Sequence, residues 1–169
     1  MNFLKLKASY GHLGYAGNTG FFFYRTNWTK GDKVEFRPTI GGNVTNLARW
    51  GNPDLDWEYS NELNVGVEGV FFGNRLSAEI NYFHELRKNI IGVNNAKYAA
   101  VGGDFVPYEN IGEVLNQGFD AYINWNDKIG RDFTYNVGFN VTYTKNKLRK
   151  SSEFGDIEEY RKAIGRPTS

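Results

Sequence analysis

Apolar and polar residues alternate along several stretches of this chain, most clearly between Asn61 and Arg87. Two alternating runs are joined there by Gly73-Asn74, a pair that supplies the positive φ angles of a two-residue hairpin turn. Because side chains on a strand alternate with a period of two, this loop places the apolar residues of both runs on one face. The predicted pairs on that face are Phe71 with Leu76, Gly69 with Ala78, Val67 with Ile80, Val65 with Tyr82 and Leu63 with His84.

A second hairpin is predicted towards the end of the chain. One alternating run covers 119–126 and the other 133–144, and both have an aromatic-rich apolar face. A three-residue loop, Lys128-Ile129-Gly130, with Gly130 in the left-handed conformation, fits a common hairpin type. This loop pairs Trp125 with Phe133 and Phe119 with Phe139.

The remaining chain divides into one further strand and two long connections. Residues 3–11 alternate and predict a first strand, whereas 12–57 and 88–114 are long, Gly-rich or Asn-rich and irregular. Connections of such length in a compact domain are usually functional or disordered.

Two weaker patterns lie in these irregular parts. A short strand pair is predicted at 21–29 and 33–40, across a turn at Lys30-Gly31-Asp32. After 145 the chain is polar, and apolar residues at helical spacing predict a short amphipathic helix that stops at Gly165-Arg166-Pro167: Phe154, Ile157, Tyr160 and Ile164.

The connections alternate between tight turns and long loops. Neighbouring antiparallel strands therefore place both tight turns at one rim and both long loops at the other. This asymmetry, with strands of about 10–13 residues, is typical of an outer-membrane barrel wall. The polar face is rich in Asn, Gly, Ser and Thr, as a watery lumen would be, and aromatic residues near strand ends fit interfacial girdles: Phe71, Trp125, Phe133 and Tyr143. We expect an all-β antiparallel meander of about five long strands.

Composition supports the all-β prediction and excludes several classes of function. The 169 residues are 17% aromatic and include 20 Gly, and aromatic residues favour strands while Gly favours turns. The net charge of +1 gives no support for a nucleic-acid partner. The absence of cysteine excludes disulfides and thiolate metal sites. Met1 is followed directly by strand-like sequence, so no signal peptide is expected.

Glu68 faces Glu79 in the predicted hairpin, at the spacing that a retaining glycosidase requires of its two carboxylates. The alternative is a pair of lumen-wall carboxylates balanced by water or by Lys5 and Lys7 on an adjacent strand, and this alternative is favoured.

No other motif predicts catalysis or a cofactor. His84 and Glu85 point to opposite faces of a strand, and Gly14–Gly20 lacks the Lys-Ser/Thr of a phosphate loop. Asp54 and Asp56 could contribute to a calcium site but more often cap a turn. We expect no metal and no cofactor.

Aromatic residues in the long connections are the candidates for substrate binding. Flat rings stack on sugar faces, and binding residues concentrate in loops. The candidates are Trp28, Trp50, Tyr98 and Tyr108, with packing inside the loops as the alternative for each.

Two motifs of the sequence are distinctive: Leu4-Lys5-Leu6-Lys7-Ala8-Ser9-Tyr10-Gly11 and Gly51-Asn52-Pro53-Asp54-Leu55-Asp56-Trp57-Glu58. The first resembles a strand of the late barrel region of SusC/RagA-type TonB-dependent transporters, and the second is similar to that family's most recognisable barrel motif. The similar segments 71–76, 110–119, 124–130 and 164–167 follow in the family's order.

This resemblance implies a segment of a roughly 22-stranded transmembrane β-barrel with short periplasmic turns and long extracellular loops. It also implies a non-catalytic outer-membrane importer of oligosaccharides or peptides, energised through TonB and covered by a SusD-like lipoprotein. We expect residues 1–169 to be a partial barrel domain without the plug and the remaining strands. The alternatives are a soluble or secreted carbohydrate-binding β-sandwich and a porin-like passive channel.

Overall fold

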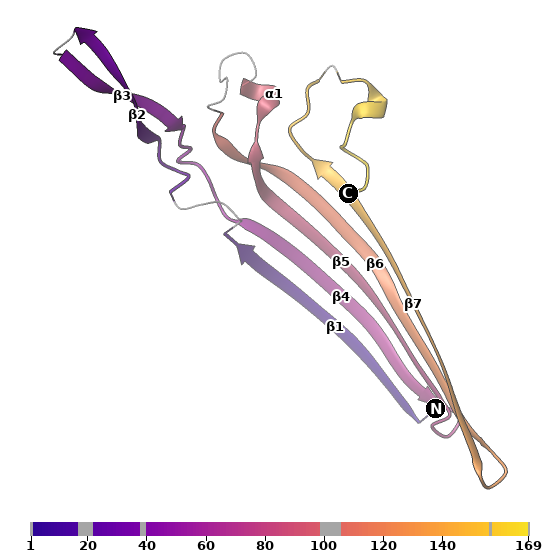
Figure 1. Cartoon of the computed structure of the whole chain (residues 1–169). Coiled ribbons are helices and arrows are strands. Elements are labelled where there is room, and N and C mark those ends of the chain that lie inside the picture. Colours follow the sequence, from indigo (N-terminus) through magenta and orange to yellow (C-terminus); the bar gives the residue numbers. More distant parts are fainter. Residues whose placement is uncertain (1, 17–21, 38–39, 99–105, 156, 169) are drawn as a thin grey trace.

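The computed structural model describes residues 2–16, 22–37, 40–98, 106–155 and 157–168. Five antiparallel strands form one sheet in the order β1-β4-β5-β6-β7, and two further strands form a separate hairpin beyond it (Figure 1). The sheet strands are β1 (Phe3–Tyr15), β4 (Glu58–Phe71), β5 (Leu76–Val93), β6 (Tyr108–Ile129) and β7 (Phe133–Lys150). The separate hairpin pairs β2 (Asn27–Arg37) with β3 (Ile40–Arg49), and the short helices are α1 (Asn95–Tyr98) and a 3-10 turn at Glu159–Arg161.

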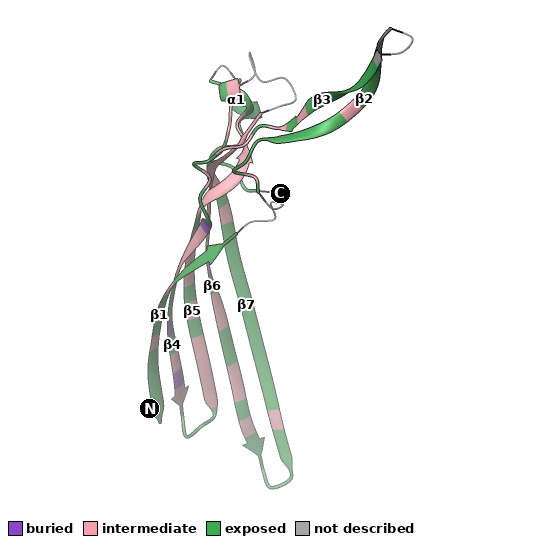
Figure 2. Ribbon diagram, turned by 90° about the vertical axis from the view of Figure 1, so that its left-hand side faces the viewer, coloured by how far each residue is buried: buried purple, intermediate pink, exposed green. Residues whose placement is uncertain are grey.

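The sheet is a single layer, and no other described part of the chain covers either face (Figure 2). Among the described residues no apolar side chain is buried, and Leu6 and Phe139 are 75% and 65% exposed. A β-sandwich would bury the inner faces of two packed sheets. The predicted alternative of a β-sandwich is therefore wrong. In the described part of the chain no helix is long and apolar enough to cross a membrane.

The β4–β5 hairpin confirms the prediction for 61–87. Every predicted pair from Phe71–Leu76 to Leu63–His84 is present, and Glu68 faces Glu79. Gly73 and Asn74 have φ values of 66° and 71°, and the Arg75 N–H donates to the Phe72 carbonyl oxygen across the turn. Turn chemistry and alternation thus gave the same register.

The β6–β7 hairpin confirms the predicted faces but corrects the register. The loop is Gly130-Arg131-Asp132, so that Trp125 pairs with Val137 and Phe119 with Tyr143. The prediction that Trp125 pairs with Phe133 and Phe119 with Phe139 is wrong by four residues. A shift by an even number leaves every side chain on its original face, so the alternation could not distinguish the two registers.

Three other boundaries differ from the predictions. The strand pair of the first connection exists, but Lys30–Asp32 interrupts the ladder inside β2 instead of forming the turn. Strands β5, β6 and β7 extend to 18, 22 and 18 residues, which shortens the connection predicted at 88–114. The predicted C-terminal helix is reduced to the 3-10 turn, because the Ala163 and Ile164 N–H groups bond to the Glu153 carboxylate instead of to the preceding helical turn.

Candidate functional site

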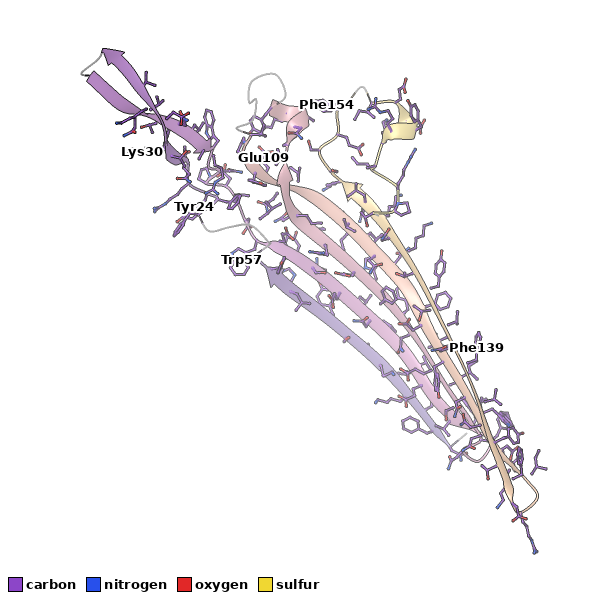
Figure 3. All side chains as sticks on the ribbon, in the orientation of Figure 1. Tyr24, Lys30, Trp57, Glu109, Phe139 and Phe154 are labelled. Carbon is purple, nitrogen blue, oxygen red and sulfur yellow. The ribbon has the colours of Figure 1, made fainter. Side chains whose placement is uncertain are left out.

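One face of the sheet carries a continuous apolar band. Successive rows of paired residues cross all five strands, for example Leu6, Val67, Ile80, Ala121 and Val141. From Leu63 to Phe71 the band runs about 27 Å along β4 at the rise of an antiparallel strand. The outer face of a membrane barrel carries an apolar band of about 25 Å. Phe139 of β7 projects from this face (Figure 3).

The opposite face is polar and carries the facing pair of carboxylates. Lys7 of β1 lies between them: its Nζ donates to Glu79 Oε1 and is 3.6 Å from Glu68 Oε2. Asn81 Nδ2 also donates to Glu79 Oε1, at 2.9 Å. The ammonium of Lys7 offsets the repulsion between like charges, as expected for carboxylates of a polar wall.

The segment 52–58 is tied to two other strands at the end of the sheet that carries the long connections. Asn110 of β6 accepts the Asp56 N–H at Oδ1 and donates from Nδ2 to the Asp56 carbonyl oxygen, both at 2.8 Å. The buried Glu58 accepts the Ile91 N–H at 3.0 Å and forms an ion pair with Arg87 of β5. These bonds fix where the long first connection joins the sheet.

Glu109, labelled in Figure 3, anchors the second long connection. Its carboxylate lies 2.6 Å from the Lys97 Nζ and accepts bonds from Asn94 and the Tyr98 hydroxyl. The charge-assisted bond from Lys97 lowers the pKa of Glu109 to about 2, although burial opposes this shift. The same bond raises the pKa of Lys97. Ser152 Oγ donates to Asn94 Oδ1 and so joins the segment after β7 to this group.

Arginine and aromatic side chains gather at the base of the β2–β3 hairpin. The Arg49 guanidinium lies 4.0 Å above the Phe23 ring, and that ring meets the edge of Tyr108 at 4.8 Å. Arg25 lies 5.4 Å from the ring centre of Tyr24, which Figure 3 labels. Sequence analysis did not select either arginine. The only local signal was the position of Arg25 directly after four consecutive aromatic residues.

The chain matches a family model described as "TonB dependent receptor-like, beta-barrel" over residues 2–165. The chain belongs to this family. TonB-dependent receptor P26 of Formosa agariphila is 30% identical over 149 residues, which cover 86% of this chain and 14% of that protein. TonB-dependent receptor SusC of Bacteroides thetaiotaomicron is 26% identical over 111 residues, which cover 64% of this chain and 11% of that protein.

A solved structure gives the same assignment to the TonB-dependent receptor barrels. The RagAB peptide importer in its "closed-closed" state superposes with a TM-score of 0.73 at 26% identity, over 97% of this chain and 18% of that chain. The "open-open" state of the same importer gives a TM-score of 0.71. The predicted resemblance to SusC/RagA-type transporters is confirmed, and the chain spans less than a fifth of these relatives.

The four predicted aromatic residues do not form one cluster within this TonB-dependent receptor segment. Trp28 on β2 and Trp50 after β3 are 60% and 56% exposed, whereas Tyr98 ends α1 in the β5–β6 connection and Tyr108 is the first residue of β6. The Tyr98 hydroxyl bonds to Glu109, and the Tyr108 ring packs on Phe23. The two tryptophans are therefore the more available rings for a ligand.

Two side chains of the family motif, those of Asn52 and Asp56, form turn-capping bonds. Asn52 Oδ1 accepts the Asp54 N–H at 3.0 Å, and Asp56 Oδ1 accepts the Trp57 N–H at 2.8 Å. No group of three metal-ligating side chains is present among the described residues. His12 Nδ1 lies 2.6 Å from Asn61 Oδ1, and its ring meets Tyr59.

Proposed function

We propose that this chain forms part of the wall of a TonB-dependent outer-membrane importer of oligosaccharides or peptides. The apolar face contacts lipid, the polar face borders a watery lumen, and the long connections lie outside the cell. In this proposal residues 1–169 are one part of a barrel domain.

The observation that carries the proposal is the single, uncovered sheet with one apolar and one polar face in a chain of this family. In water, an apolar face of this size is a liability, since soluble monomers rarely expose contiguous apolar patches above a few hundred Å². Against lipid the same face is favourable. The inner strands β4, β5 and β6 satisfy their backbone groups within the sheet, and in a complete barrel the outer edges of β1 and β7 would pair with further strands.

The relatives suggest the partners and the substrate. One curated relative is named SusC, and the solved neighbour is described as a peptide importer. We infer that a SusD-like lipoprotein covers the end with the long connections and that TonB supplies energy at the end with the tight turns. A porin-like passive channel is the competing function and would need no TonB.

Uptake by intact cells tests the proposal. Cells that express the protein are given a defined mixture of neutral and acidic oligosaccharides and short peptides, and depletion of each compound is measured with and without TonB. We expect depletion of one class that stops when TonB is deleted or a protonophore is added. Depletion that continues without TonB would favour the passive channel, and recovery of the protein outside the outer-membrane fraction would contradict both.

The chain is proposed to bind its substrate without modifying it. Trp28 and Trp50 are proposed to stack on the substrate, with Tyr98 and Tyr108 positioning the loops. Trp28→Ala and Trp50→Ala should slow uptake without changing the amount of protein in the membrane, and Tyr160→Ala, an exposed aromatic after β7, is the control. Any hydrolysis product that disappears in Glu68→Gln would contradict the non-catalytic assignment.

A further inference from the structure

A cavity of about 300 Å³ lies at the base of the β2–β3 hairpin. Phe22, Arg25, Thr26, Asn27 and Arg49 line it. Two guanidinium groups, a hydroxyl and a carboxamide thus share one small space. Its volume is at the lower end of ligand pockets, which are about 300–1,000 Å³, and suits one sugar ring or one amino-acid side chain.

Neither arginine is neutralised within the described part of the chain. The ion pairs found there use other cations, such as Arg75 with Asp127 and Arg87 with Glu58. Arg49 Nη2 donates to the Phe22 carbonyl oxygen at 3.0 Å, whereas Arg49 Nε is buried and has no hydrogen-bond partner among the described residues. The Arg49 guanidinium is therefore incompletely hydrogen-bonded by the described residues, and an anionic ligand in the cavity would balance its charge.

Aromatic rings hold both guanidinium planes. Arg49 stacks on Phe23 with its central carbon 4.0 Å from the ring centre. The central carbon of Arg25 lies beside two rings, 5.9 Å from the ring centre of Phe22 and 5.4 Å from that of Tyr24. Stacking uses the face of a guanidinium group and leaves its N–H edge available for a planar, bidentate acceptor. A carboxylate has that geometry.

The backbone around the cavity is held by close contacts. The Arg25 N–H bonds to the Phe22 carbonyl oxygen, and Phe22 adopts a φ of 63°, which is uncommon for a bulky residue. A Cβ at Gly51 would lie 2.2 Å from the Arg25 carbonyl carbon, so only glycine allows this approach. The Gly51 N–H also donates to Thr26 Oγ1 at 3.2 Å.

The cavity is also attached to the wall. Asn52 Nδ2 donates to the Tyr108 carbonyl oxygen at the start of β6, and the Tyr108 ring packs on Phe23 beneath Arg49. The segments around the cavity are therefore joined to β6, the strand that carries Glu109 and Asn110. This position is at the end of the sheet with the long connections.

We propose that Arg25 and Arg49 bind the carboxylate of an acidic substrate in this cavity, with Thr26 and Asn27 bonding to neighbouring hydroxyl or amide groups. The inference rests on the proposed import function and specifies its substrate as carboxylate-bearing. A uronic-acid oligosaccharide and an acidic peptide share this chemistry.

Binding to the epitope-tagged protein, extracted in detergent from outer membranes, tests the proposal. The probes are a uronic-acid oligosaccharide with its carboxyl-reduced counterpart, and an acidic peptide with its fully amidated counterpart. We expect the protein to prefer the acid over the neutral counterpart by about tenfold in one of the two pairs, a difference that salt reduces. The pair in which the preference occurs identifies the source of the carboxylate.

Arg25→Gln and Arg49→Gln should each remove most of that preference. Arg49→Lys should restore part of it, because lysine keeps the charge but lacks the planar fork. The matched control is Arg75→Gln, which removes an arginine at the opposite end of the sheet and should leave the preference unchanged. If Arg49→Gln does not reach the membrane, the result for Arg25→Gln is used instead, since among the described residues the Arg25 side chain donates no hydrogen bond to the backbone.

Equal affinity for acid and neutral probes in both pairs, or an unchanged preference in Arg25→Gln, would overturn this inference. The import function is assessed separately through TonB-dependent uptake by the same variants. Unchanged uptake with no acid preference would refute the carboxylate site alone, whereas loss of all TonB-dependent uptake in the unmutated protein would refute the import function.

Discussion

Asn110 and Asp56, 54 positions apart in the chain, are joined by two hydrogen bonds of 2.8 Å, one in each direction. Asn110 Nδ2 also donates to the Asn89 carbonyl oxygen at 2.7 Å. One side chain of β6 therefore fixes both the segment that leads into β4 and a bulge in β5, where Asn89 has a φ of 57°. The long first connection cannot move away from the sheet without breaking these bonds.

Replacing Asn110 with alanine should loosen the end of the sheet that carries the long connections. The change leaves the Asp56 N–H and two carbonyl groups without these partners, so we expect a loss of about 1–3 kcal/mol in local stability. This loss would appear as faster proteolysis within residues 52–57 of the membrane-embedded Asn110→Ala variant than of the unmutated protein. Asn136→Ala, at an exposed position of β7, is the control and should not change the cleavage rate.

Phe139 and Asn140 are neighbours on β7 that point to opposite faces of the sheet, and they test which face contacts lipid. Phe139→Arg should reduce recovery of folded protein from outer membranes, because an arginine on the lipid face is unfavourable, by about 2–4 kcal/mol at mid-membrane and less towards the interfaces. Asn140→Arg places the same charge on the polar face and should be tolerated. Equal recovery of the two variants would contradict the assignment of the faces.

Gly118 and Gly138 differ in the space around them. A Cβ at Gly118 would lie 2.1 Å from the Tyr143 carbonyl oxygen and 2.7 Å from the Phe83 ring, whereas a Cβ at Gly138 would meet its nearest atom at an ordinary 3.4 Å. Gly118→Ala should therefore force β6 and β7 apart and destabilise the sheet by about 1–3 kcal/mol. Gly138→Ala should be nearly neutral. The temperature at which each purified variant loses its β-sheet circular dichroism compares the two.

The lowered pKa of Glu109 predicts that acid destabilises the connection between β5 and β6. Its pKa is lowered from 4.5 to about 2 in the folded protein. A lowered carboxyl pKa means that the stabilisation is complete above the unfolded value and is lost as the pH falls from about 4.5 towards 2. Hydrogen exchange at Lys97 and Tyr98, whose N–H groups bond to the Asn94 carbonyl oxygen, should accelerate over this range and stay constant above pH 5 after correction for the intrinsic rate.

Glu109→Gln is the matched variant for that measurement. It removes the titrating group, so its exchange rates should already be high at neutral pH and should change little as the pH falls. An acid-dependent acceleration of the same size in Glu109→Gln would assign the effect to another group.

Local patterns in the sequence determined the faces of the sheet, the complete β4–β5 register and the rim that carries the tight turns. Each of these depends only on alternation with a period of two and on turn residues such as Gly73 and Asn74. The family motif around Asn52–Glu58 was likewise visible in the sequence, although the bonds that its residues form were not.

Only the tertiary structure decided features that depend on where distant segments meet. The β6–β7 register was one, since alternation could not distinguish pairings that differ by four residues. The full lengths of strands β5, β6 and β7 were another. The residues that lengthen these strands pair with their neighbours although their sequence does not alternate. Asp56 meets Asn110 because β4 and β6 lie on either side of β5. Arg25 and Arg49 share one cavity because Gly51 allows close backbone approach. Such contacts are set by long-range pairing, which no local pattern specifies.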